Sequence, residues 1–210
     1  MSWIPWMTKK PWDARLAAFL VRGLVGTPVT PNHITTVSLA LGLAAAGLFA
    51  TGGSTAANWA AGLFILARLA DHMDGELARL ADQASAFGHW YDYLVGGISY
   101  AALFLALGIG NSDGVLGAWA IPAGAFVAGF ILLNMGLRMK MDRDYGSDTV
   151  GYPGVGSADL EDTVYLLGPI TWFGALEYFF LLGCVGTLCF AGWTIVTFIA
   201  RRRGLGRGAV

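Results

Sequence analysis

The chain has 210 residues, of which 56% are hydrophobic and only 13% are charged, and its formal net charge is -1. A mean hydropathy of +0.59 is high for a soluble domain of this length, and apolar runs long enough to cross a bilayer as helices recur along the chain. The near-neutral charge provides no electrostatic basis for binding nucleic acid. We therefore predict an all-α integral membrane protein with a single domain over residues 1–210.

Residues 1–27 predict an amphipathic helix that lies along the membrane interface. Four large apolar residues share one helical face and two arginines lie on another; these are Trp12, Leu16, Phe19 and Leu20, and Arg15 and Arg22. This pattern is typical of interfacial helices. An ordinary amphipathic helix packed on the rest of the protein is the alternative. The segment is not a secretory signal, because no clean apolar core precedes a small-residue cleavage site.

Six membrane spans are predicted next, in a bundle over residues 31–200, and a basic tail occupies residues 201–210. Pro28 and Pro31 end the first helix, and Thr30 or Asn32 can cap the next one. The apolar runs place the spans at 34–50, 56–81, 87–107, 115–139, 160–173 and 176–200. Cys184 and Cys189 both fall in the last run, where we interpret them as buried hydrophobic residues and not as a disulfide or metal pair.

The distribution of lysine and arginine predicts how these spans are oriented. Basic residues precede the first span, follow the last, and lie between the second and third and between the fourth and fifth. The turns at 51–55, 108–114 and 173–175 contain none. The positive-inside rule makes the basic side cytoplasmic, so both termini are predicted to be cytoplasmic. The expected location is the cell membrane of a bacterium or archaeon.

The stretch from Asp71 to Gly96 places several carboxylates beside this hydrocarbon environment. A charged side chain at the centre of a membrane helix costs about 2.5–3.5 kcal/mol or more, so such carboxylates need partners. Asp71 and Asp74 are three residues apart and lie on neighbouring parts of one helical face. Gly75 follows, and a glycine lets a ligand approach the backbone closely. Carboxylate oxygens are the ligands that Mg²⁺ prefers, so a divalent metal is the predicted partner.

This stretch resembles the signature of the CDP-alcohol phosphotransferase (phosphatidyltransferase) family, D-x2-D-G-x2-A-R-x8-G-x3-D-x3-D. Seven positions match in register: Asp71, Asp74, Gly75, Ala78, Arg79, Gly88 and Asp92. The last position is Gly96, where the family has aspartate. A second similarity is the Pro-Asn pair followed by a threonine at the start of the first span, which Asn32 and Thr35 match.

The resemblance implies a fold, a reaction and a set of partners. The fold is six membrane helices preceded by an interfacial helix, assembled as a homodimer; small residues in the third and fourth spans permit close helix contact. The reaction transfers a phosphatidyl group from a CDP-alcohol, such as CDP-diacylglycerol, to an acceptor hydroxyl and releases CMP, in phospholipid biosynthesis. Membrane lipids and the acceptor alcohol are the other expected partners.

The resemblance also implies roles for individual residues. Asp71, Asp74 and Asp92 would hold two Mg²⁺ (or Mn²⁺) ions, which stabilise the entering and leaving oxygens. The implied CDP-alcohol-binding residues are Asn32, Thr35, Asp71, Asp74, Gly75, Ala78, Arg79, Ser85 and Gly88. Independently, the residue types suggest that Arg68, Arg138 and Lys140 could bind a phosphorylated acceptor. Acids at 142–162 would instead suit a cationic acceptor such as choline, so the acceptor stays open.

Gly96 leaves the position of the family's general base without a side chain. The chain is then an inactivated variant, a natural subgroup with another base, or a membrane protein that binds CDP-alcohols without transferring them. His89 projects to nearly the same helical face about 10 Å away and is the candidate substitute base; a histidine with a structural hydrogen bond is the alternative. An ion or solute transporter is the remaining hypothesis, because acids inside helical bundles also mark ion pathways.

Overall fold

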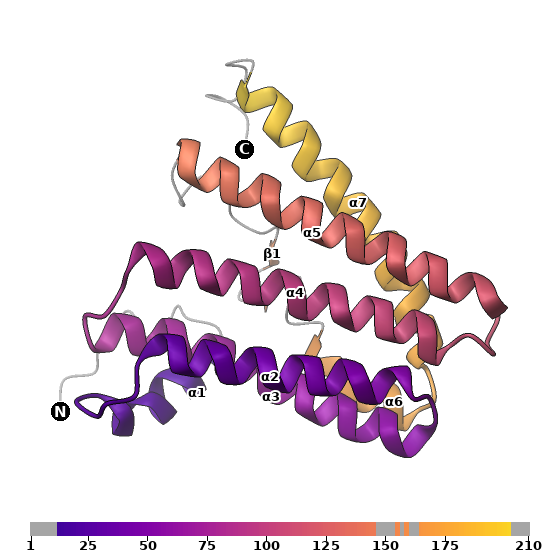
Figure 1. The fold of residues 1–210 in the computed structure, drawn as a ribbon, viewed down its shortest axis with the longest axis horizontal. Helices are drawn as coiled ribbons and strands as arrows, with labels where there is room; N and C mark the ends of the chain where they lie inside the picture. The colour runs from indigo at the N-terminus through magenta and orange to yellow at the C-terminus, as the bar shows by residue number, and fades with distance from the viewer. Residues whose placement is uncertain (1–11, 146–153, 156–157, 160–163, 203–210) are drawn as a thin grey trace.

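The computed structural model describes residues 12–145, 154–155, 158–159 and 164–202, and within these ranges the chain is a bundle of long helices (Figure 1). The long helices are α2 (Pro31–Ala50), α3 (Ser54–Leu80), α4 (Ala86–Gly110), α5 (Ala120–Tyr145) and α7 (Leu176–Arg202). The short ones are α1 (Trp12–Leu20), α6 (Leu167–Trp172) and the 3-10 turns η2 (Val21–Leu24) and η3 (Gly117–Trp119). Two-residue strands β1 (Gly154–Val155) and β2 (Ala158–Asp159) pair antiparallel, with Gly154 opposite Asp159. The helical fold class is confirmed.

The helices pack in an order that follows the chain. α2 packs on α3 and α4, α4 packs on α5, and α5 packs on α7, while α1 and α6 lie against α3. The α3–α4 connection, α1 and the C-terminal ends of α5 and α7 lie toward one end of the bundle, at the left of Figure 1. The charged stretch that begins at Asp71 is therefore at this end. The expectations for residues 1–11 and for the tail beyond Arg202 lie outside the described residues.

Local sequence signals determine where the helices around this end begin. Thr30 precedes α2, Pro31 occupies its first turn, and the Nδ1 atom of His33 accepts a hydrogen bond from the Thr30 backbone N–H at 3.2 Å. Ser85 caps α4, because its Oγ accepts a hydrogen bond from the Gly88 N–H at 3.0 Å. Each cap satisfies a backbone donor that the helix leaves without a partner. The charged stretch is thus divided between the end of α3 and the first turns of α4.

Small residues bring α4 and α5 into close contact within the chain. A Cβ added at Gly108 would lie 2.5 Å from the Ala120 carbonyl oxygen, and one at Gly124 would lie 2.6 Å from the Phe104 carbonyl oxygen. Only glycine allows backbones to approach this closely. Small residues of the third and fourth predicted spans, such as Gly108 and Gly124, therefore serve a contact within the chain. Their presence is not by itself a reason to expect a dimer contact.

Four helical segments are long and apolar enough to cross a membrane: Pro31–Ala50, Ala86–Gly110, Gly117–Asp144 and Leu176–Ala200. α3, the second predicted span, has 27 residues and is long enough at about 40 Å, but its charged second half lowers its hydropathy. The fifth predicted span, 160–173, is not confirmed. Among the described residues there, α6 has only six residues, or about 9 Å of helix, far short of a bilayer.

The first helix presents its large apolar side chains outward. Trp12 is 51% exposed and Phe19 is 66% exposed, and Leu16 and Leu20 also stay exposed. The packed side of α1 consists of Asp13, Ala17 and Ala18, which are buried. α1 therefore packs on the bundle through its small side chains, and its large apolar side chains stay partly exposed, with the Trp12 ring 4.8 Å from the Tyr165 ring.

Candidate functional site

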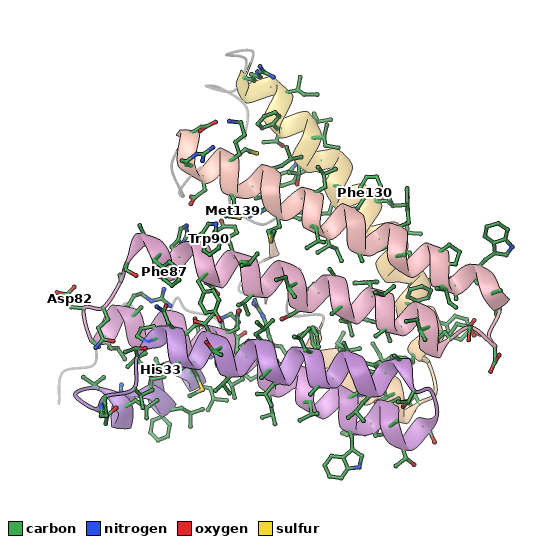
Figure 2. All side chains as sticks on the ribbon, viewed as in Figure 1. His33, Asp82, Phe87, Trp90, Phe130 and Met139 are labelled. Carbon is green, nitrogen blue, oxygen red and sulfur yellow. The ribbon has the colours of Figure 1, made fainter. Side chains whose placement is uncertain are left out.

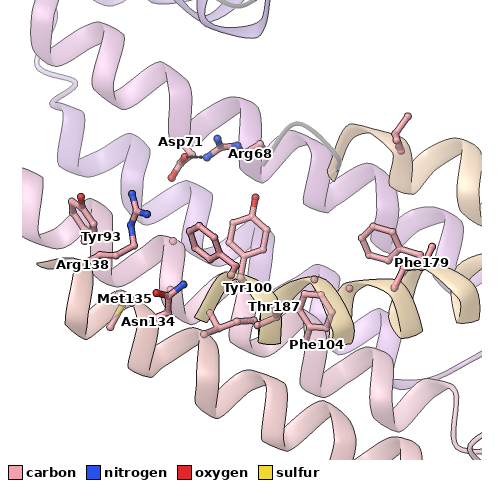
Figure 3. A pocket seen from close by; sticks show the side chains of 18 of the residues that line it. Arg68, Asp71, Tyr93, Tyr100, Phe104, Asn134, Met135, Arg138, Phe179 and Thr187 are labelled. Carbon is pink, nitrogen blue, oxygen red and sulfur yellow. Dashed lines mark hydrogen bonds and ion pairs between the residues drawn. The ribbon is translucent and has the colours of Figure 1, made fainter. Parts of the chain in front are cut away.

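A cavity of about 850 Å³ runs between α3, α4, α5, α6 and α7 (Figure 3). Its charged lining residues come from α3, α4 and α5: Arg68, Asp71, His89, Asp92 and Arg138. Away from these residues the lining is mostly apolar and aromatic, with Phe104, Ile131, Leu166, Ile170, Phe179 and Leu182. One bound molecule could therefore place a charged group at the end lined by charged residues and an apolar part along the rest of the cavity.

The three aspartates predicted to bind metal do not share one environment. Asp71 and Asp92 line the cavity from α3 and α4, and the Oδ2 atom of Asp71 accepts a hydrogen bond from Arg68 Nη1 at 2.6 Å. Asp74 is buried, with 4% of its surface exposed, and one of its carboxylate oxygens accepts a hydrogen bond from the Thr35 hydroxyl. Thr35 and Asp74, two residues of the predicted nucleotide site, are therefore in direct contact.

The donor chemistry of these residues fits a hard divalent cation, because two carboxylates face one cavity from different helices. No group of three or more His, Cys, Asp or Glu side chains is arranged to hold a metal ion in the described part of the chain. The predicted set of three ligands is thus only partly assembled: Asp71 and Asp92 share the cavity, and Asp74 is held by Thr35.

Three further residues of the predicted nucleotide site come together where α2 and α4 begin. A Cβ added at Gly88 would lie 3.1 Å from Ser85 Oγ and 3.2 Å from Asn32 Oδ1. Both are tighter than ordinary contacts, so a side chain at Gly88 would push these polar groups apart. Two helix N-termini, each with a partial positive charge, meet at this point. The arrangement suits an anionic ligand.

Gly75 and Arg79 are also neighbours. A Cβ at Gly75 would lie 3.3 Å from an Arg79 guanidinium nitrogen, and Arg79 Nη2 donates a hydrogen bond to Glu76 Oε1 at 2.9 Å. Glu76 is almost fully buried, whereas the Arg79 side chain is 61% exposed. Glu76 thus orients an arginine that can reach a ligand. The sequence analysis did not single out Glu76, although an acid three residues before an arginine is a recognised helix pair. Ala78 is half-buried on the same helix.

Gly96 lines the cavity together with Asp92, and a Cβ added there would meet no atom within 4 Å. Among the described residues, no side chain occupies the position of the family's base. His89 also lines the cavity, and its Nε2 lies 2.6 Å from Oδ2 of Asp142 on α5. Asp142 was not predicted as a partner, because the two residues are 53 positions apart and no local pattern links them.

The candidate acceptor-binding residues separate into two groups. Arg68 and Arg138 line the cavity, and Arg138 is buried, with 3% of its surface exposed. Lys140 does not line it; its Nζ donates a hydrogen bond to Asp144 at 2.8 Å on an exposed part of α5. Asn134, one turn before Arg138, lines the cavity and was missed, although an asparagine in the middle of an apolar span is itself a signal.

A buried carboxylate connects α1 to the charged stretch. Asp13 is 0% exposed, and its Oδ2 lies 2.7 Å from His72 Nε2 and 3.2 Å from the Tyr165 hydroxyl, which donates to it. His72 lies between Asp71 and Asp74 on α3. Asp13 therefore joins α1, α3 and the segment before α6. The sequence contained no signal for this contact.

Together these features define a helical integral membrane protein with a cavity whose charged end is lined by two aspartates and two arginines. The profile of the CDP-alcohol phosphatidyltransferase family matches residues 28–200, and the chain belongs to this family. The match spans α2 to α7 and includes both motif segments recognised in the sequence. Comparison with curated proteins finds no match.

Proposed function

We propose that this chain transfers a phosphatidyl group from a CDP-alcohol, such as CDP-diacylglycerol, to an acceptor hydroxyl in a metal-dependent step of phospholipid biosynthesis. The observation that carries the proposal is the cavity, whose charged end is lined by Asp71 from α3 and Asp92 from α4. Family membership supplies the reaction class. The apolar continuation of the cavity suits the hydrocarbon part of a lipid substrate.

In this reaction the acceptor oxygen forms a bond to the phosphorus farther from cytidine. The bond from that phosphorus to the oxygen of CMP breaks, CMP leaves with the electron pair, and the acceptor proton passes to a base. Bound Mg²⁺ or Mn²⁺ would lower the cost of the negative charge on both oxygens. Asp71, Asp74 and Asp92 would hold the metal, and Arg79 would contact a donor phosphate through its planar guanidinium.

The position of the protein in the membrane belongs to the same proposal. The charged end of the cavity faces the cytoplasm of a bacterial or archaeal cell, where nucleotide-linked substrates and released CMP are handled, and both termini lie on that side. The exposed apolar face of α1 rests in the lipid interface. The protein works as a homodimer, a property taken from the family.

A second candidate function is supported by the open space at Gly96. Without a carboxylate there, the chain would bind CDP-alcohols and release little or no CMP. The contact between His89 and Asp142 supports the transferase instead, because an acid hydrogen-bonded to a histidine fixes the orientation of the imidazole ring. A transport path is not favoured, since the charged lining residues gather at one end of the cavity.

CMP release decides between these functions. The purified full chain in lipid nanodiscs receives CDP-diacylglycerol, Mg²⁺ and a panel of acceptors. Metal-dependent CMP release supports the transferase, whereas metal-dependent binding of CDP-diacylglycerol without CMP supports the non-catalytic binder. Neither binding nor release would refute both. Asp92→Asn is the informative variant, because it keeps the side-chain shape and removes one charge from the cavity.

A further inference from the structure

The charges that line the cavity bear on the acceptor, which the family alone leaves undefined. Residue types in the sequence permit either a phosphorylated or a cationic acceptor. Of the acids that would favour a cation, the two with described side chains have partners on their own side of α5: Asp142 pairs with His89, and Asp144 pairs with Lys140. Neither of these acids is among the cavity-lining residues. The cavity instead contains buried cationic and amide groups from α5.

Arg138 is the principal cation of this group. It is 97% buried within a helix that is apolar enough to cross the membrane, and its guanidinium carbon lies 5.5 Å from the centre of the Phe190 ring. Packing on an aromatic ring fixes the orientation of the guanidinium plane. Buried charges inside membrane segments mark substrate sites, and the planar fork of arginine matches phosphate bidentately.

Asn134 supplies the second recognition group. It lies four residues before Arg138, so both side chains project from the same face of α5, and Figure 3 shows both extending into the cavity. Asn134 is 93% buried, and its Oδ1 atom has no hydrogen-bond partner among the described residues. A buried carbonyl oxygen of this kind needs a donor, and a hydroxyl group of a bound molecule is a suitable one.

We propose that Arg138 and Asn134 form an acceptor subsite that selects a phosphorylated polyol. The arginine binds the phosphate, the asparagine oxygen accepts a hydrogen bond from one hydroxyl, and a second hydroxyl is the one that attacks the donor. Arg68 lies across the cavity and pairs with Asp71, so a second cation borders the same space. This proposal rests on the proposed transfer function, but binding to the subsite does not require turnover.

The test measures both binding and turnover for the purified full chain in nanodiscs. The probes are glycerol 3-phosphate and inositol 1-phosphate, compared with glycerol, inositol, serine and choline. We expect only the phosphorylated polyols to raise the melting temperature without donor and to serve as acceptors for CMP release from CDP-diacylglycerol. Arg138→Lys, which keeps the charge and loses the fork, should weaken their binding by about 10- to 100-fold.

Asn134→Leu separates recognition from folding. It removes a buried carbonyl that has no partner, so the melting temperature without ligand should stay the same or rise. The Kd for the phosphorylated polyols should nevertheless increase by about tenfold. Arg143→Gln is the matched control on α5, because its side chain is 76% exposed and lies outside the cavity lining; this change should alter neither quantity.

The outcomes distinguish the subsite from the transfer reaction. In one outcome, phosphorylated polyols raise the melting temperature of the wild type but not that of Asn134→Leu, and no CMP is released. This result supports the subsite and counts against the transfer reaction. CMP release with serine or choline that glycerol 3-phosphate does not inhibit overturns the subsite and leaves transfer standing. If Arg138→Lys weakens CDP-diacylglycerol binding and leaves polyol phosphate binding unchanged, Arg138 belongs to the donor site and the proposal is wrong.

Discussion

Gly96→Asp tests the proposed reaction most directly. A Cβ at this position would meet no atom within 4 Å, so a carboxylate fits without displacing a neighbour. It would lie one helical turn beyond Asp92 and face the same cavity. Loss of a general base typically costs about 10²–10⁴-fold in rate, so restoring one should raise CMP release by a comparable factor.

The same change should leave the fold intact. The expected rate gain corresponds to about 2.7–5.4 kcal/mol of activation free energy, whereas replacing a glycine inside a helix changes stability by no more than about 1 kcal/mol. Gly108→Ala is the contrasting control. Its Cβ would lie 2.5 Å from the backbone carbonyl oxygen of Ala120, which cannot move aside as a side chain can, and overpacking of this kind costs about 1–3 kcal/mol. A lower melting temperature is expected for that variant only.

The assay follows initial rates of CMP release at saturating CDP-diacylglycerol and Mg²⁺, for the wild type and Gly96→Asp, each with and without His89→Ala. If His89 is the native base, Gly96→Asp gives little gain and His89→Ala abolishes turnover in the wild type. The contact with Asp142 at 2.6 Å then explains its orientation. Robust turnover that neither substitution affects would refute the reasoning about both positions.

Three other predictions follow from the same residues. Asp71→Asn and Asp74→Asn should each weaken CDP-alcohol binding in parallel with Mg²⁺ binding, measured by calorimetry. In Asp74→Asn the amide oxygen still accepts the Thr35 hydrogen bond, so the fold is preserved. CDP-alcohol binding that persists in excess chelator would exclude a metal requirement. Asp13→Ala should lower stability by about 1–3 kcal/mol, because it removes the buried carboxylate that accepts a hydrogen bond from the Tyr165 hydroxyl; each kcal/mol corresponds to about 2–4 °C in melting temperature. Asp113→Ala, at an exposed site, should not lower the stability. Mass measurement in nanodiscs should show a homodimer, and a monomer at native lipid ratios would contradict this.

Properties that depend on composition and local spacing could be predicted from the sequence alone. The expected spans at 34–50, 87–107 and 176–200 correspond to α2, α4 and α7, because length and hydropathy decide which segments can cross a bilayer. Glycine at position 88 was assigned to the nucleotide site by its place in the motif, and the structure sets it against Ser85 and Asn32. The contact with Ser85, three residues away, follows from local helix geometry, whereas the contact with Asn32 needs α2 to pack on α4.

Contacts between residues far apart in the chain were decided only by tertiary packing. Asp142 pairs with His89 across 53 positions, and Tyr165 reaches Asp13 across 152; no helical period encodes either contact. Among its described residues the apolar run at 160–173 forms a 3-10 turn at 164–166 and the short α6, because hydropathy measures preference for lipid and not the length of helix that packing allows. The burial of Asn134 beside Arg138 likewise depends on how α5 meets α4 and α7, since the same residues on an outward face would have contacted lipid or water.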